Sequence, residues 1–197
     1  MADKPTQKNR ELAIETPLGE DVLLLVSMSA TEKLGRLFKY ELELASENGQ
    51  IKADKIVGQN VTIRLDIGAG RTRYFNGHVS HFRQLTSSGQ LARYQTTIVP
   101  WLWFLSRTAN CRIFQEQTIP DIVKKVFRER GFTNFEDALS GTYKTWEYCV
   151  QYRETDFSFV SRLMEHEGIY YYFKHENGKH SVLLSDSYRA HEPYHEF

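Results

Sequence analysis

Residues 150–172 read VQYRETDFSFVSRLMEHEGIYYY, and they predict a strand, a helix and a second strand in succession. Apolar and polar residues alternate at the start of this stretch, which is typical of a strand. Thr155 is a preferred residue for a helix N-cap, Asp156 suits the first helical turn, and Gly168 suits the position just after a helix. Aromatic residues then follow one another from Ile169 to Phe173, as in a strand.

This stretch, with the four residues before it, predicts which side chains share a face. Alternation places one apolar set on a single side of the first strand: Trp146, Tyr148, Val150 and Tyr152. Spacing by three and four residues places a second set on the core side of the helix: Phe157, Val160, Leu163 and Met164.

The flanking sequence extends this pattern in both directions. Downstream, Asn177 and Gly178 form a turn dipeptide that predicts a β-hairpin. Upstream, Thr118 is placed to cap a helix that has Pro120 in its first turn and Gly131 beyond its end. Residues 107–197 are therefore expected to form a small α+β unit.

Closely spaced strands precede that unit. Residues 38–44 and 61–67 alternate cleanly, and Thr72–Leu85 reads as a long strand that Asn76-Gly77 interrupts with a bulge or a tight turn. Several short strands with Gly-rich turns favour a barrel or a sandwich. The predicted fold class is α+β, with a disordered lead-in over residues 1–10, a β-barrel-like domain over 11–106 and the smaller unit over 107–197.

The charges are balanced overall but segregated along the chain. Twenty-five basic and 25 acidic residues give a net charge of zero. Residues 67–115 contain no acid and six arginines: Arg71, Arg73, Arg83, Arg93, Arg107 and Arg112. These arginines suit contacts with partner subunits, or, with their aromatic neighbours, the stacking of nucleic-acid bases. The lack of an overall positive charge disfavours nucleic acid.

The sequence predicts no catalytic, cofactor-binding or metal-binding residue. It has no nucleophile-elbow motif and no phosphate-binding loop. His78 and His81 lie three apart in a strand and point to opposite faces, and His191 and His195 fall in the terminal tail. Glu165, His166 and Glu167 are read as a solvated helix end. We therefore expect a chain that is not an enzyme.

The sequence also bears on location. No apolar run approaches the roughly 20 residues that span a bilayer, and the N-terminus lacks the apolar core of a signal peptide. Cys111 and Cys149 fit reduced side chains better than a disulfide framework. These features predict a chain made in the cytoplasm, with no stable membrane insertion.

Four motifs in order resemble the VgrG family, the spike proteins of bacterial type VI secretion, and the related phage tail hub proteins. They are residues 150–171, Thr16-Pro17-Leu18-Gly19 followed by Leu23-Leu24, Glu32–Phe38 and Trp101–Arg107. The resemblance covers roughly residues 12–190. In the longest motif it assigns structural roles to nine residues: Tyr152, Arg153, Glu154, Asp156, Phe157, Arg162, Leu163, Glu165 and Gly168.

The resemblance implies a structural hub and no enzyme. Family members form trimers with two barrel-like domains per chain, and the resulting ring of six barrels matches the sixfold Hcp tube. Later regions form an OB-like domain and a β-helix needle that bears a PAAR tip protein or an effector. This chain is expected to be the N-terminal hub portion, truncated before those regions, and to leave the cytoplasm through the secretion apparatus without a signal peptide. The alternative is a stand-alone β-rich module that acts as an adaptor or binds nucleic acid through the Arg71–Arg112 block.

Overall fold

The computed structural model describes residues 4–86 and 90–191, which form two compact units. The first unit contains the described residues up to Glu32, together with 37–100 and 175–180. The second contains 33–36, 101–174 and the described residues from Ser181 onward. The longest segment of the first unit ends at Pro100, and the longest segment of the second begins at Trp101. The division is also discontinuous in the sequence. Residues 33–36 are grouped with the second unit, and residues 175–180 are grouped with the first.

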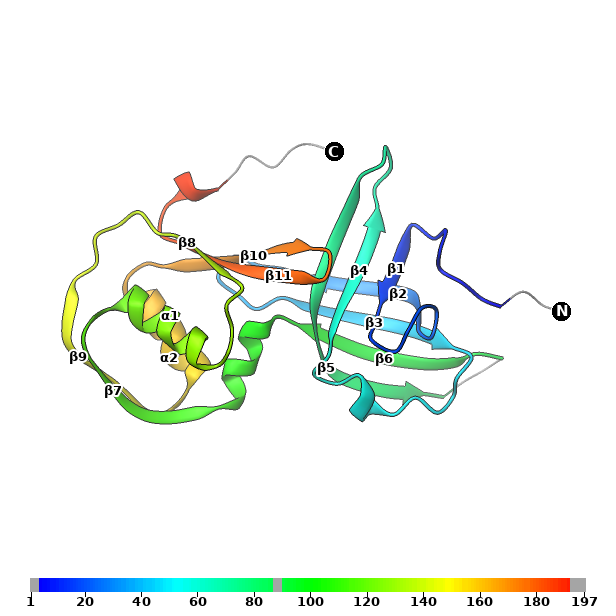
Figure 1. Ribbon diagram of the computed structural model, residues 1–197, viewed down its shortest axis with the longest axis horizontal. Coiled ribbons are helices and arrows are strands. Elements are labelled where there is room, and N and C mark those ends of the chain that lie inside the picture. Colours follow the sequence, from blue (N-terminus) through cyan, green and yellow to red (C-terminus); the bar gives the residue numbers. More distant parts are fainter. Residues whose placement is uncertain (1–3, 87–89, 192–197) are drawn as a thin grey trace. The chain divides into compact units, whose positions relative to one another are not determined.

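The first unit is a curled six-stranded antiparallel sheet (Figure 1). Its strands are β1 (Leu12–Glu15), β2 (Leu24–Thr31), β3 (Lys39–Ser46), β4 (Asn60–Asp66), β5 (Thr72–Leu85) and β6 (Ala92–Val99), and a 3-10 turn, η1, covers Ala53–Lys55. The spatial order is β1-β4-β5-β6-β3-β2. The concave side is filled by alternating apolar residues, including Phe38, Tyr40, Leu42 and Leu44, which are all buried.

Strand β5 differs from its expected form at Asn76-Gly77. The strand continues through this pair, and the irregularity in its pairing with β6 lies between Val79 and His81. A Cβ atom at Gly77 would lie 2.6 Å from Ile98 Cγ2 and 2.9 Å from the Val99 carbonyl oxygen. The glycine is therefore needed for close packing against β6, and it marks neither a turn nor a bulge.

Gln7 joins the two end strands of this sheet. Its side-chain amide donates to the carbonyls of Ile14, at 2.7 Å, and Leu23, at 3.2 Å. Its side-chain oxygen accepts from the backbone N–H groups of Ile14 and Leu25. One carboxamide thus takes the place of a peptide group between β1 and β2, which are otherwise the open ends of the sheet.

This contact differs from the disorder expected over residues 1–10. Gln7 is buried, and Arg64 of β4 donates to the carbonyls of Gln7 and Lys8 at 3.1 Å. The segment is polar, so its composition suggests a solvated tail, whereas backbone groups of the sheet satisfy the Gln7 side chain and Arg64 satisfies the carbonyls. Residues 1–3 lie outside the described part of the chain.

The second unit combines helices with two small sheets (Figure 1). Its elements are η2 (Trp101–Arg107), β7 (Ala109–Thr118), α1 (Ile119–Glu129), β8 (Phe135–Ala138), β9 (Thr145–Thr155), α2 (Asp156–His166), β10 (Tyr170–Glu176), β11 (Lys179–Ser185) and η3 (Tyr188–Ala190). Strands β7 and β9 form an antiparallel ribbon, and the other sheet has the order β10-β11-β8. The turn of the β10–β11 hairpin, which contains Asn177 and Gly178, belongs to the first unit.

Both predicted helices are present with their predicted ends. The Thr118 hydroxyl accepts from the Asp121 N–H at the start of α1, and the Thr155 hydroxyl accepts from the Ser158 N–H at the start of α2. Gly131 and Gly168 follow the two helices with φ values of +80° and +70°. The predicted α+β class, a barrel-like domain followed by a smaller α+β unit, is confirmed.

The structure buries a different phenylalanine of α2 from the one that the sequence predicts. Phe157 is only half-buried, whereas Phe159 is fully buried and stacks on Phe114 of β7 with ring centroids 5.5 Å apart. Val160, Leu163 and Met164 are buried as predicted. The shift arises because Asp156 is itself turned inward, which rotates the buried face of the first helical turn.

Candidate functional site

The β7–β9 ribbon carries the most exposed group of large apolar side chains in the second unit. Its register pairs Ile113 with Val150, Cys111 with Tyr152 and Gln115 with Tyr148. Ile113 and Tyr152 are each 64% exposed, Tyr148 is 60% exposed and Val150 is 38% exposed. Directly opposed residues share one side of an antiparallel pair, so these four form one surface, here called the ribbon face. Phe114, Cys149 and Gln151 are buried on the other side.

Asp156 is the centre of a buried polar network behind the ribbon. Its carboxylate is fully buried and accepts hydrogen bonds from Arg130 Nε, at 2.6 Å, from Gln151 Nε2, at 2.8 Å, and from the Thr108 hydroxyl, at 3.0 Å. Arg112 Nη2 adds an ion pair at 3.2 Å. Burial alone would raise the pKa of Asp156, but these hydrogen bonds and the Arg112 charge outweigh it and lower that pKa. The network fixes β7, β9 and both helices around one charge.

Glu154 and Arg162 form a second anchor between β9 and α2. Arg162 Nε lies 3.0 Å from Glu154 Oε2, and Arg162 Nη2 lies 2.7 Å from Glu154 Oε1. The same Nη2 also donates to the Val150 carbonyl at 2.7 Å. This paired geometry holds the helix against the strand whose other side carries the ribbon face.

The remaining motif residues are divided between the core and the surface. Leu163 lies in the core, whereas Glu165 is exposed and lies 3.9 Å from Arg36, a contact of little energetic value. Tyr152 lies on the ribbon face, and the Arg153 guanidinium carbon lies 5.1 Å from the centre of its ring. The motif of residues 150–171 therefore combines internal anchors with exposed side chains.

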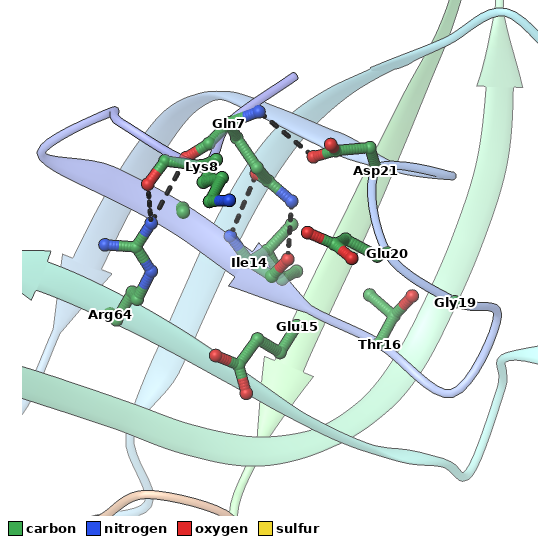
Figure 2. Close-up of a pocket in the computed structure, with 10 residues that line it drawn as sticks. Gln7, Lys8, Ile14, Glu15, Thr16, Gly19, Glu20, Asp21 and Arg64 are labelled. Atoms are coloured by element: carbon green, nitrogen blue, oxygen red, sulfur yellow. Dashed lines mark hydrogen bonds between the residues drawn. The ribbon is translucent and has the colours of Figure 1, made fainter. Parts of the chain in front are cut away.

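A cavity of about 370 Å³ lies beside Gln7 in the first unit (Figure 2). Its wall includes Arg64 on one side and Glu15, Glu20 and Asp21 on the other. Arg64 is engaged by the carbonyls of the N-terminal segment, and Asp21 accepts from the Gln7 N–H at 3.0 Å. A hydrogen bond from the Thr6 side chain, together with the one from the Gln7 N–H, lowers the pKa of Asp21. Arg64 and Asp21 therefore hold the N-terminal segment on the sheet.

Three histidines gather in the first unit, which the sequence did not predict. The His175 and His180 rings lie 5.9 Å apart, and His78 lies 5.9 Å from His180. His180 Nδ1 lies 2.8 Å from Asn76 Oδ1, and His175 Nδ1 accepts from the Asn76 N–H at 3.0 Å. Burial, with the charges of the other two histidines, lowers the pKa of His180 to about 3. His78 lies about 100 residues before the other two in the sequence, so no local signal linked it to them.

No metal site forms from these or other side chains within residues 4–86 and 90–191. His81 is exposed, and its partner in the sequence pattern, His78, is turned toward His180. His195 lies outside the described residues. Within the same described ranges no helix has the length and apolar character needed to cross a membrane.

The six arginines of the Arg71–Arg112 block are divided between the units. Arg71, Arg73, Arg83 and Arg93 belong to the first unit, and Arg107 and Arg112 belong to the second. Arg112 is mostly buried and is paired with both Asp156 and Glu129. Arg73 lies 3.9 Å from Glu32 and over the Phe75 ring, and Arg107 lies over Trp103. Several of these arginines are thus engaged inside their own unit.

Comparisons with known proteins give the family. Residues 31–196 match the model of the phage tail baseplate hub (GPD) family. The chain is 53% identical over 186 residues to the type VI secretion system spike protein VgrG1b of Pseudomonas aeruginosa, a match that covers 94% of this chain and 25% of that protein. The chain thus spans about a quarter of the length of this relative.

Solved structures agree with this match. An Escherichia coli protein, c3393, described as a component of the type VI secretion system with similarity to the T4 tail proteins gp27 and gp5, has a TM-score of 0.76 and 27% identity. The match covers 87% of this chain and 50% of that one. A chain of the Francisella PdpA-VgrG complex has the same fold, with a TM-score of 0.60, 12% identity and coverage of 91% and 32%. The chain belongs to the phage tail baseplate hub family and, within it, to the VgrG spike proteins, of which it forms part of the hub.

Proposed function

We propose that this chain trimerises as the N-terminal hub portion of a type VI secretion spike and caps the Hcp tube. The observation that carries the proposal is the 53% identity to VgrG1b over 94% of the chain. In this role the chain couples the tube to the puncturing spike, and a PAAR tip protein or an effector is carried by other regions of the same protein. It resides in the cytoplasm before firing and then leaves through the apparatus.

Two features of the structure support a mechanical role. The Gln7 carboxamide pairs with both end strands of the six-stranded sheet, which protects its open ends and stiffens it. The ribbon face leaves four large apolar side chains in water, an arrangement typical of a surface that a protein partner covers. A coupling element needs both a stiff body and surfaces that associate.

Sedimentation of the 197-residue chain over a range of concentrations, with and without Hcp rings, tests this function. We expect a trimer at high concentration and a heavier species when Hcp is added. A chain that stays monomeric at every concentration and ignores Hcp would refute the proposal.

A further inference from the structure

Residues 175–180 of the first unit, here called the hairpin tip, are held on the six-stranded sheet by two histidines. The pairing of β5 with β6 begins at His78, so Asn76 lies on a part of β5 beyond the end of β6. Asn76 is fully buried, and its N–H donates to His175 Nδ1 at 3.0 Å. On the other side of the turn, His180 Nδ1 lies 2.8 Å from Asn76 Oδ1. The backbone and the side chain of one buried asparagine thus bind both histidines of the tip.

The hydrogen bonds of His175 require a neutral ring. A backbone N–H can only donate, so His175 Nδ1 accepts from Asn76 and carries no proton. The proton of the neutral ring is then on Nε2, which lies 3.1 Å from the Tyr40 hydroxyl, and that hydroxyl donates in turn to Glu32. A second proton would have to bind Nδ1, where it would face the Asn76 N–H. Protonation of His175 therefore breaks its hydrogen bond to the sheet.

His180 is held in the other neutral form. The Asn76 side-chain nitrogen donates to the Val61 carbonyl and to the Thr62 hydroxyl. Asn76 Oδ1 is therefore the acceptor toward His180, and the His180 proton is on Nδ1. The His180 ring is buried, 5.9 Å from the His175 ring. A second proton would create a buried cation, and it would repel a protonated His175.

The other charged and titratable side chains around the two rings come from β3, from β5 and from the residue after β2. They are Glu32, Tyr40, Arg73 and His78. Glu32 lies 3.6 Å from His175 Nε2 and favours a protonated ring, whereas Arg73 disfavours it. Burial outweighs the attraction of Glu32 and lowers the pKa of His175. Burial, with the charges of His175 and His78, also lowers the pKa of His180. Both rings therefore bind a proton more readily once the tip has left the sheet.

Release of the hairpin tip requires no strand of the large sheet to separate. The order β1-β4-β5-β6-β3-β2 includes neither β10 nor β11. The contacts of the tip with the sheet involve side chains, including the Thr62 hydroxyl, which accepts from the Gly178 N–H at 3.2 Å. A segment attached in this way can open locally while the strand ladder stays intact.

We propose that the hairpin tip is a pH-sensitive switch, which stays on the sheet while His175 and His180 are neutral and leaves it in mild acid while the six strands remain paired. The released rings have the ordinary histidine pKa of about 6.5, above that of the docked rings, so docking weakens as the pH falls below this value. The equilibrium constant for opening should rise about tenfold per pH unit for each ring that binds a proton on release. This switch goes beyond the tube-capping role and does not depend on it.

Amide hydrogen exchange of the 197-residue chain, followed by NMR between about pH 7 and pH 5, tests the switch. The reporters are the N–H groups of Asn76 and Gly178, and the references are those of Leu42 and Ile98 on the central strands β3 and β6. Each rate is corrected for the intrinsic exchange rate at that pH. We expect the reporters to be at least about tenfold less protected than the references. Below pH 6.5 their protection should fall by about tenfold to a hundredfold per pH unit.

Variants identify the groups that titrate. Asparagine offers an acceptor or a donor near the position of Nδ1 and does not titrate, so His175→Asn/His180→Asn should make reporter protection nearly independent of pH. His81→Asn, at an exposed position of β5, should keep the parent's pH dependence.

Three results would overturn the proposal. They are reporters as well protected as the references at pH 5, wild-type reporter protection that does not change with pH, and a folded double variant that keeps the parent's slope. If the double variant does not fold, the wild-type curves decide alone. Reporter protection that lies below the references and falls with acid supports the switch, and reporter curves that coincide with the references refute it.

Discussion

Strand β3 of the first unit and strand β9 of the second both alternate polar and apolar side chains, yet they bury opposite sets. In β3 the apolar set is inside, as Tyr40 and Leu42 show. In β9 the apolar set is outside, while Cys149 and Gln151 are covered. Gln151 is turned inward because it donates to the buried Asp156 carboxylate. Alternation therefore gives the period of a strand, and the groups behind the strand decide which side meets water.

The largest effect is expected when the charge behind β9 is removed. Asp156→Ala leaves Arg112 and Arg130 without their buried partner, so the free energy of unfolding should fall by about 3–5 kcal/mol. Urea denaturation measures this change. The matched control is Glu165→Ala, whose exposed pairing with Arg36 should contribute at most about 0.5 kcal/mol. Equal losses in the two variants would show that Asp156 does not organise the ribbon.

The first unit should be the more sensitive of the two to mild acid. His180 is neutral when folded, with a pKa lowered to about 3 by burial and by the other two histidines. Its unfolded pKa is about 6.5, so the unfolded state binds the proton first and stability falls as pH drops below that value. Between pH 6.5 and 4 the loss should reach about 3 kcal/mol.

Melts in this pH range test the histidine effect directly. His180→Asn should flatten the pH dependence, whereas His81→Asn, at an exposed position of β5, should leave it unchanged. Asp156 has a lowered pKa, so the stabilisation that it provides is lost mainly below its unfolded pKa of about 3.9, at or under the lower end of this window. A His180→Asn protein with the parent's pH slope would contradict the assignment.

A smaller effect is expected at the closure of the six-stranded sheet. Gln7→Ala removes the partner of the Ile14 and Leu25 N–H groups and should lower stability by about 2 kcal/mol. Lys8→Ala, at the exposed neighbouring position, is the control and should be nearly neutral. Faster hydrogen exchange at Ile14 and Leu25 in the Gln7 variant alone would locate the change. Unchanged exchange there would show that Gln7 does not close the sheet.

Local signals were enough to predict much of this fold. Thr118 and Thr155 cap the two helices as their sequence context indicates, and Gly168 ends the second one. The fold class could be predicted because helix caps, hydrophobic periodicity and turns depend on residues that are neighbours in the sequence. Side chains that act across the fold were missed, since Gln7 replaces a peptide group between distant strands and His180 meets His78 only after folding.

The candidate site was predicted in part for the same reason. The apolar side of β9 was correctly grouped from its alternation, but no local pattern shows that this side faces out. That result depends on Asp156, which draws Gln151 to the opposite side.

The most direct test of the account compares two adjacent residues of β7 that point to opposite sides. Ile113 belongs to the ribbon face and Phe114 to the core. We predict that Ile113→Ser changes the free energy of unfolding by less than about 0.5 kcal/mol, whereas Phe114→Ala lowers it by about 3–5 kcal/mol. In sedimentation, Ile113→Ser should weaken association with other copies or with Hcp while the fold stays intact. A large loss of stability in Ile113→Ser, with association unchanged, would show that this surface is part of the core and would contradict the account.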